Sequence, residues 1–193
     1  MGILSEPLEA VRRLRLAPGF SVAELGDQWI TEGERRLAKD WFEGAMHCGR
    51  YVSIDGNDRG TMCADLNRPL IPWPGEFDLV TDFGTGEHVF DQRQVYKTMH
   101  DLCKVGGYMA FDRPVSGYVG HCFWLASEAV YRDLAAANRY EIQWLEFRDT
   151  TRGRLIRGVM RRLSAGKFVV PQQGRYRKLL RPITREAADA QEA

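Results

Sequence analysis

The sequence predicts an α/β protein built on a doubly wound, mostly parallel sheet of seven strands with helices on both faces. Short apolar runs alternate with helical patterns along most of the chain, as in sheets whose parallel strands are covered on both sides. The 193 residues are 44% hydrophobic, which suffices for one sizeable core but not for two. We therefore expect a single domain over residues 1–185, of which 164–185 form a basic extension, and a polar tail over 186–193.

Seven strand-like runs follow one another along the chain. The first five are short and almost continuously apolar, as buried parallel strands are, whereas the last two are longer and mixed, as edge strands are. We expect the last strand to pair with the sixth as a hairpin and so to be antiparallel. The runs cover residues 20–24, 51–54, 61–64, 77–81, 108–111, 141–147 and 154–163.

Three amphipathic helical patterns separate these runs. In the last pattern, Ser127 precedes the apolar repeat as an N-cap. After the second, Gly106-Gly107 is placed to end the helix. The patterns cover residues 32–46, 92–103 and 127–138.

Two aspartates follow the second and third strands. Asp55 ends one strand, and Asp65 follows the next. In open α/β sheets, ligands bind beyond the carboxyl ends of the strands, where the strand order reverses, and a carboxylate there can accept both hydroxyls of a ribose. Either aspartate could instead bind the amides of its own turn. Because both follow strands at the expected spacing, we favour ligand contact.

This order of strands and carboxylates, with a Gly-Gly pair before the fifth strand, resembles the Rossmann-like class I S-adenosylmethionine-dependent methyltransferases over about residues 20–163. The resemblance implies S-adenosyl-L-methionine as cofactor. It implies that Asp55 holds the ribose and that Asp65 and Leu66 hold the adenine. Glu24 and Gly26 would then meet the amino-acid end of the cofactor.

The stretch FDLVTDFGTGEHVF, residues 77–90, carries the fourth strand and the loop after it. In the family that it resembles, this loop lies beside the sulfonium and the acceptor, so Asp82 and Gly84 are assigned to the cofactor site. Residues 84–86 lack the Lys-Ser/Thr ending of a phosphate-binding P-loop, and we interpret them as the floor of an active site.

The acceptor expected from the resemblance is a small polar molecule, methylated on oxygen or nitrogen. A likeness to methyltransferase-domain proteins of sugar or polysaccharide biosynthesis, carried by residues 84–88, 99–102, 121–123, 134–138 and 171–176, favours a sugar- or nucleotide-linked compound.

The first motif departs from the family pattern. Where the family has acid-x-Gly-x-Gly-x-Gly, residues 24–29 read ELGDQW, with Gly26 as the one glycine and the large Gln28 and Trp29 after it. This degenerate motif leaves open a methyltransferase-like protein that binds a partner or a nucleotide without catalysis.

Histidines near the same edge are candidates for the proton acceptor that methyl transfer requires. We expect His88, beside Glu87, to be the base, with His121 as the second choice. His88 could instead bond to backbone at a helix entry, and His121 could pack on the acceptor as part of a lid. His100 lies among apolar residues and is expected to be a core residue.

Glu87, His88 and His121 also form a recognised metal-ligand set. Adjacent side chains rarely point at one ion, and the sequence has no His-x-His or His-x-x-x-His spacing. We therefore expect no metal.

The C-terminal part of the chain is basic. Residues 146–185 hold twelve Lys or Arg and two Asp or Glu, although the whole chain has a net charge of +1. Such a segment can hold an anionic partner, which leaves open a nucleic-acid-modifying enzyme on the same scaffold. We favour a segment that wraps the protein's own acidic body; pairing with a second copy is a third use.

The remaining signals point to a cytoplasmic location. No signal peptide is apparent, and no stretch has the roughly 18 apolar residues that a membrane span requires. The four cysteines are scattered without a C-x-x-C pair, which indicates reduced thiols.

Overall fold

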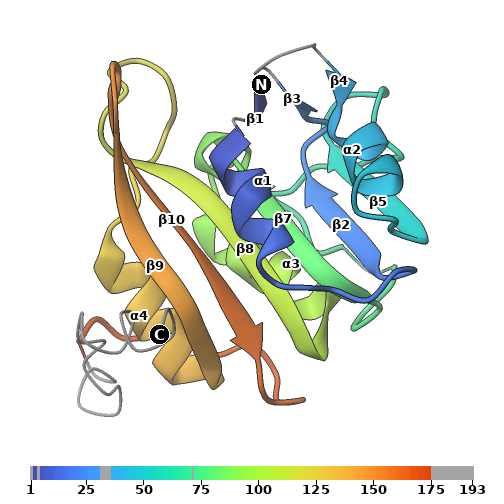
Figure 1. Cartoon of the computed structure of the whole chain (residues 1–193). Coiled ribbons are helices and arrows are strands. Elements are labelled where there is room, and N and C mark those ends of the chain that lie inside the picture. The colour runs from blue at the N-terminus through green and yellow to red at the C-terminus, as the bar shows by residue number, and fades with distance from the viewer. Residues whose placement is uncertain (1, 4, 31–35, 71, 175–193) are drawn as a thin grey trace, which may run out of the picture.

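A seven-stranded sheet forms the centre of the protein (Figure 1). The computed structural model describes residues 2–3, 5–30, 36–70 and 72–174. The strand order is β6-β5-β2-β7-β8-β10-β9, with β10 antiparallel to both neighbours and the other pairs parallel. The predicted fold class is therefore confirmed. The strands are β2 (Ser21–Leu25), β5 (Arg50–Asp55), β6 (Met62–Cys63), β7 (Phe77–Phe83), β8 (Cys103–Gly117), β9 (Tyr140–Thr150) and β10 (Gly153–Arg162).

The strand order reverses at β2, which pairs with β5 on one side and with β7 on the other. All five residues of β2 are buried, as in a central strand; four of them are small or apolar, and the fifth is Glu24. The carboxyl ends of β2, β5 and β7 meet at one edge, where open sheets of this kind bind ligands.

Helices cover both faces of the sheet (Figure 1). On one face, Val11 and Trp41 belong to a single apolar cluster with the sheet. On the other, Phe111 stacks on Tyr131 with ring centroids 3.8 Å apart. The first face carries α1 (Ser5–Arg12) and α2 (Ala38–Gly44), and the second carries α3 (Gln92–Leu102) and α4 (Glu128–Asn138).

A small second sheet and helix α1 were not predicted. This sheet consists of β1 (Gly2–Ile3), β3 (Trp29–Ile30) and β4 (Arg36–Leu37). Strands of two residues are too short to show an alternating pattern, so the sequence carries no signal for them.

Several predicted boundaries were wrong. The helix expected over residues 32–46 starts at Ala38, because Arg36 and Leu37 pair with β3 instead; residues 32–35 lie outside the described residues. Helix α3 ends at Leu102 and leads directly into β8, so Gly106-Gly107 lies within that strand. The Ser127 side chain makes no capping hydrogen bond.

The last strand differs from its predicted place at the edge of the sheet, although it pairs with the sixth strand as predicted. Strand β9 is at the edge of the sheet, but β10 lies between β8 and β9. Insertion between two strands explains the mostly buried positions of β10.

The described part of the basic extension lies along α4. Val169 and Asn138 exchange hydrogen bonds of 2.7 and 2.9 Å, and the Gly174 amide donates to Asp133 Oδ2 over 2.8 Å. The rest of the extension and the predicted tail over 186–193 lie outside the described residues.

Candidate functional site

Asp55, Asp65 and Leu66 line one small cavity of about 300 Å³ at the carboxyl edge of β2 and β5. The half-buried Asp55 accepts the Asp27 amide on Oδ2 over 2.9 Å. The exposed Asp65 accepts the Asn67 amide over 2.9 Å, and this bond holds the pKa of its carboxyl below the usual range. Asp55 also accepts the Asn57 amide of its own turn over 3.2 Å, so both aspartates cap turns, and both border the same space.

The Gln28 side chain covers Gly26 in the loop after β2. Gly26 has φ +98°, a value that favours glycine, and a Cβ atom there would overlap Thr85 Oγ1. The Gln28 side chain, 2% exposed, lies above Gly26 and donates from Nε2 to Thr85 Oγ1 over 2.6 Å. Gln28 therefore occupies room that a second glycine of the motif would leave open. Trp29 lies in β3 and lines neither this cavity nor the larger one described below.

Glu24 lies beneath this loop and lines neither of those two cavities. Its side chain is fully buried and accepts hydrogen bonds from the Tyr51 hydroxyl and, over 3.4 Å, from the Gln28 amide. Burial raises the pKa of Glu24 to about 8, because the low-dielectric interior disfavours the charged form. Its position suits holding the loop from below.

Asp82 holds the second loop in the same way. It is 1% exposed, and its Oδ1 accepts the amides of Gly86 over 2.8 Å and Thr85 over 3.3 Å. Its Oδ2 receives Arg113 Nη1 over 2.8 Å. Asp82 thus fixes the turn that follows β7, in which Gly84 adopts φ +88°.

Arg113 is a residue of the site that the sequence reasoning missed. It is 1% exposed, and besides Asp82 it approaches Glu87, with Nε 3.1 Å from Oε2. A buried guanidinium needs such partners, because its desolvation is otherwise costly. The signal was the charged Asp112-Arg113 pair directly after the apolar run 108–111 of β8.

A larger cavity of about 820 Å³ lies on the other side of this turn. Gly84, Glu87 and His121 line it from the loops, and the end of the β9–β10 hairpin closes it with polar side chains. Its lining also includes Asp112, Tyr118, Arg148, Asp149, Thr150 and Arg152.

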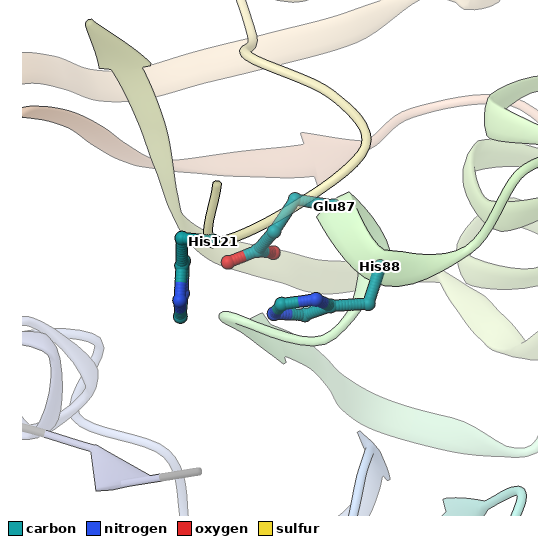
Figure 2. Close-up of side chains that lie close together, drawn as sticks. All are labelled: Glu87, His88 and His121. Atoms are coloured by element: carbon teal, nitrogen blue, oxygen red, sulfur yellow. The ribbon is translucent and has the colours of Figure 1, made fainter. Parts of the chain in front are cut away.

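Glu87, His88 and His121 converge at the boundary of the two cavities (Figure 2). The rings of His88 and His121 lie 4.9 Å apart at 80°. Ligand atoms of the three residues lie within 4.8 Å of one another, so the expectation that Glu87 and His88 point apart was wrong. Glu87 and His88 share the short turn η1 (Gly86–His88). The Glu87 carbonyl oxygen accepts the amides of Phe123 and Trp124, and these hydrogen bonds hold the loop of His121 against the turn.

Burial shapes the protonation of this cluster. It raises the pKa of Glu87, which is 2% exposed, and outweighs the opposing effect of the Arg113 charge. It lowers the pKa of His88, and the neighbouring His121 lowers it further. This shift favours the neutral form of the His88 imidazole, which is the form that can accept a proton.

His100 is a core histidine, as predicted. It is 2% exposed, and its two ring nitrogens are 2.6 Å from Tyr140 Oη and 2.9 Å from the Gly166 carbonyl oxygen.

Within the described chain, no helix has the length and apolar character needed to cross a membrane.

The sequence matches no protein-family model and no curated protein. Solved structures with the same arrangement exist at low sequence identity. One is the 1,6-didemethyltoxoflavin-N1-methyltransferase of Burkholderia thailandensis, solved with 1,6-didemethyltoxoflavin and S-adenosylhomocysteine; it is 12% identical, with a TM-score of 0.61 over 82% of this chain and 78% of that one.

Two further structures agree. The N-methyltransferase NodS of Bradyrhizobium japonicum WM9 is 15% identical, with a TM-score of 0.59 over 83% of this chain and 96% of that one. An S-adenosylmethionine-dependent methyltransferase of Mesorhizobium loti is 15% identical, with a TM-score of 0.52 over 79% and 96%. Together with the strand order and the single antiparallel strand within the sheet, these similarities show that the chain has the class I methyltransferase fold.

Proposed function

We propose that this protein transfers a methyl group from S-adenosyl-L-methionine to an oxygen or nitrogen of a small polar acceptor, such as a sugar- or nucleotide-linked compound. The observation that carries the proposal is the pair of cavities flanking residues 84–88. Methyl transfer requires the donor and the acceptor atom to be close and aligned, together with a group that takes up the proton of the acceptor. Two cavities that share one turn provide such an arrangement.

The smaller cavity would hold the cofactor. Asp55 would accept the ribose hydroxyls, while Asp65 and Leu66 would contact the adenine. Gly26 would lie beside the amino-acid end. Support for this cofactor comes from the Burkholderia thailandensis enzyme, which was solved with S-adenosylhomocysteine.

Glu24 and Asp82 would contribute to the cofactor site by holding loops rather than by touching the ligand. Glu24 supports the loop of Gly26, and Asp82 supports the turn that contains Gly84. A loop held in place before binding costs less ordering entropy when the ligand arrives.

The larger cavity would hold the acceptor, with Glu87 and His121 in its lining and His88 next to them in the lining of the cofactor cavity. His88 would be the first choice as proton acceptor and His121 the second. The cavity offers both basic and acidic side chains, among them Arg152 and Asp149, which suits a polar acceptor.

Calorimetric titration with S-adenosylhomocysteine tests the proposal. We expect one molecule to bind per chain. Because Gln28 occupies the space above Gly26, a methyltransferase-like protein without cofactor binding is the second candidate. The absence of binding at millimolar S-adenosylhomocysteine would support that candidate and overturn our proposal.

A further inference from the structure

The convergence of Glu87, His88 and His121 fits a use beyond proton transfer. In the described part of the chain, they form the one group of three or more His, Cys, Asp or Glu residues whose donor atoms lie close enough to share an ion. Figure 2 shows the Glu87 carboxylate and the two imidazole rings bordering a common space.

From this geometry we infer that Glu87, His88 and His121 bind a divalent transition-metal ion. Two imidazole nitrogens and one carboxylate oxygen form a ligand set suited to zinc, manganese or iron, whereas magnesium and calcium prefer oxygen ligands alone. Three protein ligands leave coordination positions open, as in catalytic rather than structural sites.

The donor atoms require only a small adjustment. Bonds of about 2.1 Å to one ion place ligand atoms roughly 3–3.5 Å apart. The present separations reach at most 4.8 Å, and the half-exposed rings of His88 and His121 can turn toward the ion. The buried Glu87 would serve as the fixed ligand.

Groups around the ligands hold them in place. Arg113 Nε lies 3.1 Å from Glu87 Oε2 and forms a buried ion pair with the carboxylate. The Glu87 carbonyl oxygen accepts the amides of Phe123 over 3.1 Å and Trp124 over 3.2 Å, which anchors the chain just after His121. Such outer contacts are a regular feature of metal sites, since they set ligand orientation.

Charge also favours a cation here. Asp82 and Glu87 are both nearly inaccessible to solvent, and both contact the single guanidinium of Arg113. With both carboxylates ionised, these three groups carry one excess negative charge in a low-dielectric region. A proton on Glu87 would neutralise this charge, and so would a bound cation.

The position of the ion suggests its role, and this step rests on the proposed function. Glu87 and His121 line the larger cavity, and His88 lines the smaller one. Open coordination positions would therefore face the acceptor and could take one of its oxygen atoms. With the ion bound, His88 would be a ligand rather than the base; the cation would polarise and orient the acceptor hydroxyl, whose proton would pass to solvent water as the methyl group is transferred.

Calorimetry on the metal-stripped full-length protein tests the inference. We expect one Zn²⁺ or Mn²⁺ ion per chain and at least tenfold weaker binding of Mg²⁺. His121→Ala and Glu87→Gln should each weaken Zn²⁺ binding at least tenfold. Two controls should leave it unchanged: His47→Ala, at an exposed position in the loop after α2, and Cys122→Ser, which removes a thiol beside His121.

Circular dichroism would verify that each variant is folded. Equal Zn²⁺ affinity in the wild type and in His121→Ala, or no binding to the wild type, overturns the inference. Titration of the same samples with S-adenosylhomocysteine separates the two proposals. If the protein binds S-adenosylhomocysteine but does not bind Zn²⁺, only the metal site is refuted. If it binds Zn²⁺ but does not bind S-adenosylhomocysteine, only the methyltransferase assignment is refuted.

Discussion

Gln28 donates a hydrogen bond of 2.6 Å to Thr85 and thereby joins the loop after β2 to the loop after β7. The two residues are 57 positions apart in the chain, and their side chains fill the space above Gly26. The Gln28–Thr85 contact therefore occupies the space beside Gly26 that the amino-acid end of the proposed cofactor would need.

Replacing Gln28 with alanine should tighten binding of S-adenosylhomocysteine about three- to tenfold. The wild type must break a buried hydrogen bond, worth about 1 kcal/mol net, before the amino-acid end of the ligand can approach Gly26. Calorimetry measures the change.

Gln94→Ala is the matched control for this variant. Gln94 is also buried and also donates to a threonine, Thr98, over 3.0 Å, but it lies in α3 and lines neither candidate cavity. It should lose similar stability and keep the wild-type affinity. Weaker binding by the Gln28 variant would show that Gln28 itself contacts the ligand.

Asp55→Ala should weaken S-adenosylhomocysteine binding by at least about tenfold, because charge-assisted hydrogen bonds to the ribose would be lost. Asp55→Asn keeps one acceptor oxygen for the Asp27 amide, so its affinity for S-adenosylhomocysteine should lie between those of the wild type and Asp55→Ala. Asp58→Ala serves as the control, since Asp58 is exposed in the same loop and outside the cavity. An unchanged affinity in Asp55→Ala would place the ribose elsewhere.

Arg113→Met should lower the free energy of unfolding by about 3–5 kcal/mol, because Asp82 and Glu87 would remain buried without their cation. Urea denaturation gives the value. The comparison is Arg154→Met, which removes an exposed ion pair with Asp149 and should lower the free energy of unfolding far less. Equal losses in the two variants would contradict the role assigned to Arg113.

Stability should fall as pH rises from about 4.5 to about 8, in part because of Glu24. Its pKa is raised from 4.5 in the unfolded chain to about 8 in the folded protein, so the folded state retains the proton that the unfolded state has lost. The contribution is complete below pH 4.5 and is lost as pH rises through 8.

Glu24→Gln isolates this contribution, because glutamine resembles the protonated acid and does not titrate. In urea denaturation, the wild type should lose free energy of unfolding relative to the variant, by a few kcal/mol at most, as pH rises from 5 to 8.5. A constant difference across that range would show that Glu24 is ionised throughout.

The amino-acid sequence by itself determined the seven main strands and the edge of the sheet where the site lies. Apolar runs such as that of β7 reflect burial on both faces, which is a local property of the chain. Asp55, Asp65 and Leu66 were found because they directly follow strands, and the structure places all three at one cavity.

Only the tertiary structure decided how the side chains meet at that edge. Arg113 reaches Asp82 across 31 positions, and His121 approaches Glu87 from a different loop. Glu24 and Asp82 follow the same strand-end rule as Asp55, yet they are buried beneath their loops. The sequence could not separate these buried carboxylates from Asp55, because such hydrogen bonds and ion pairs depend on which strands are neighbours and on their register. The periodicity along one strand carries no information about its neighbours.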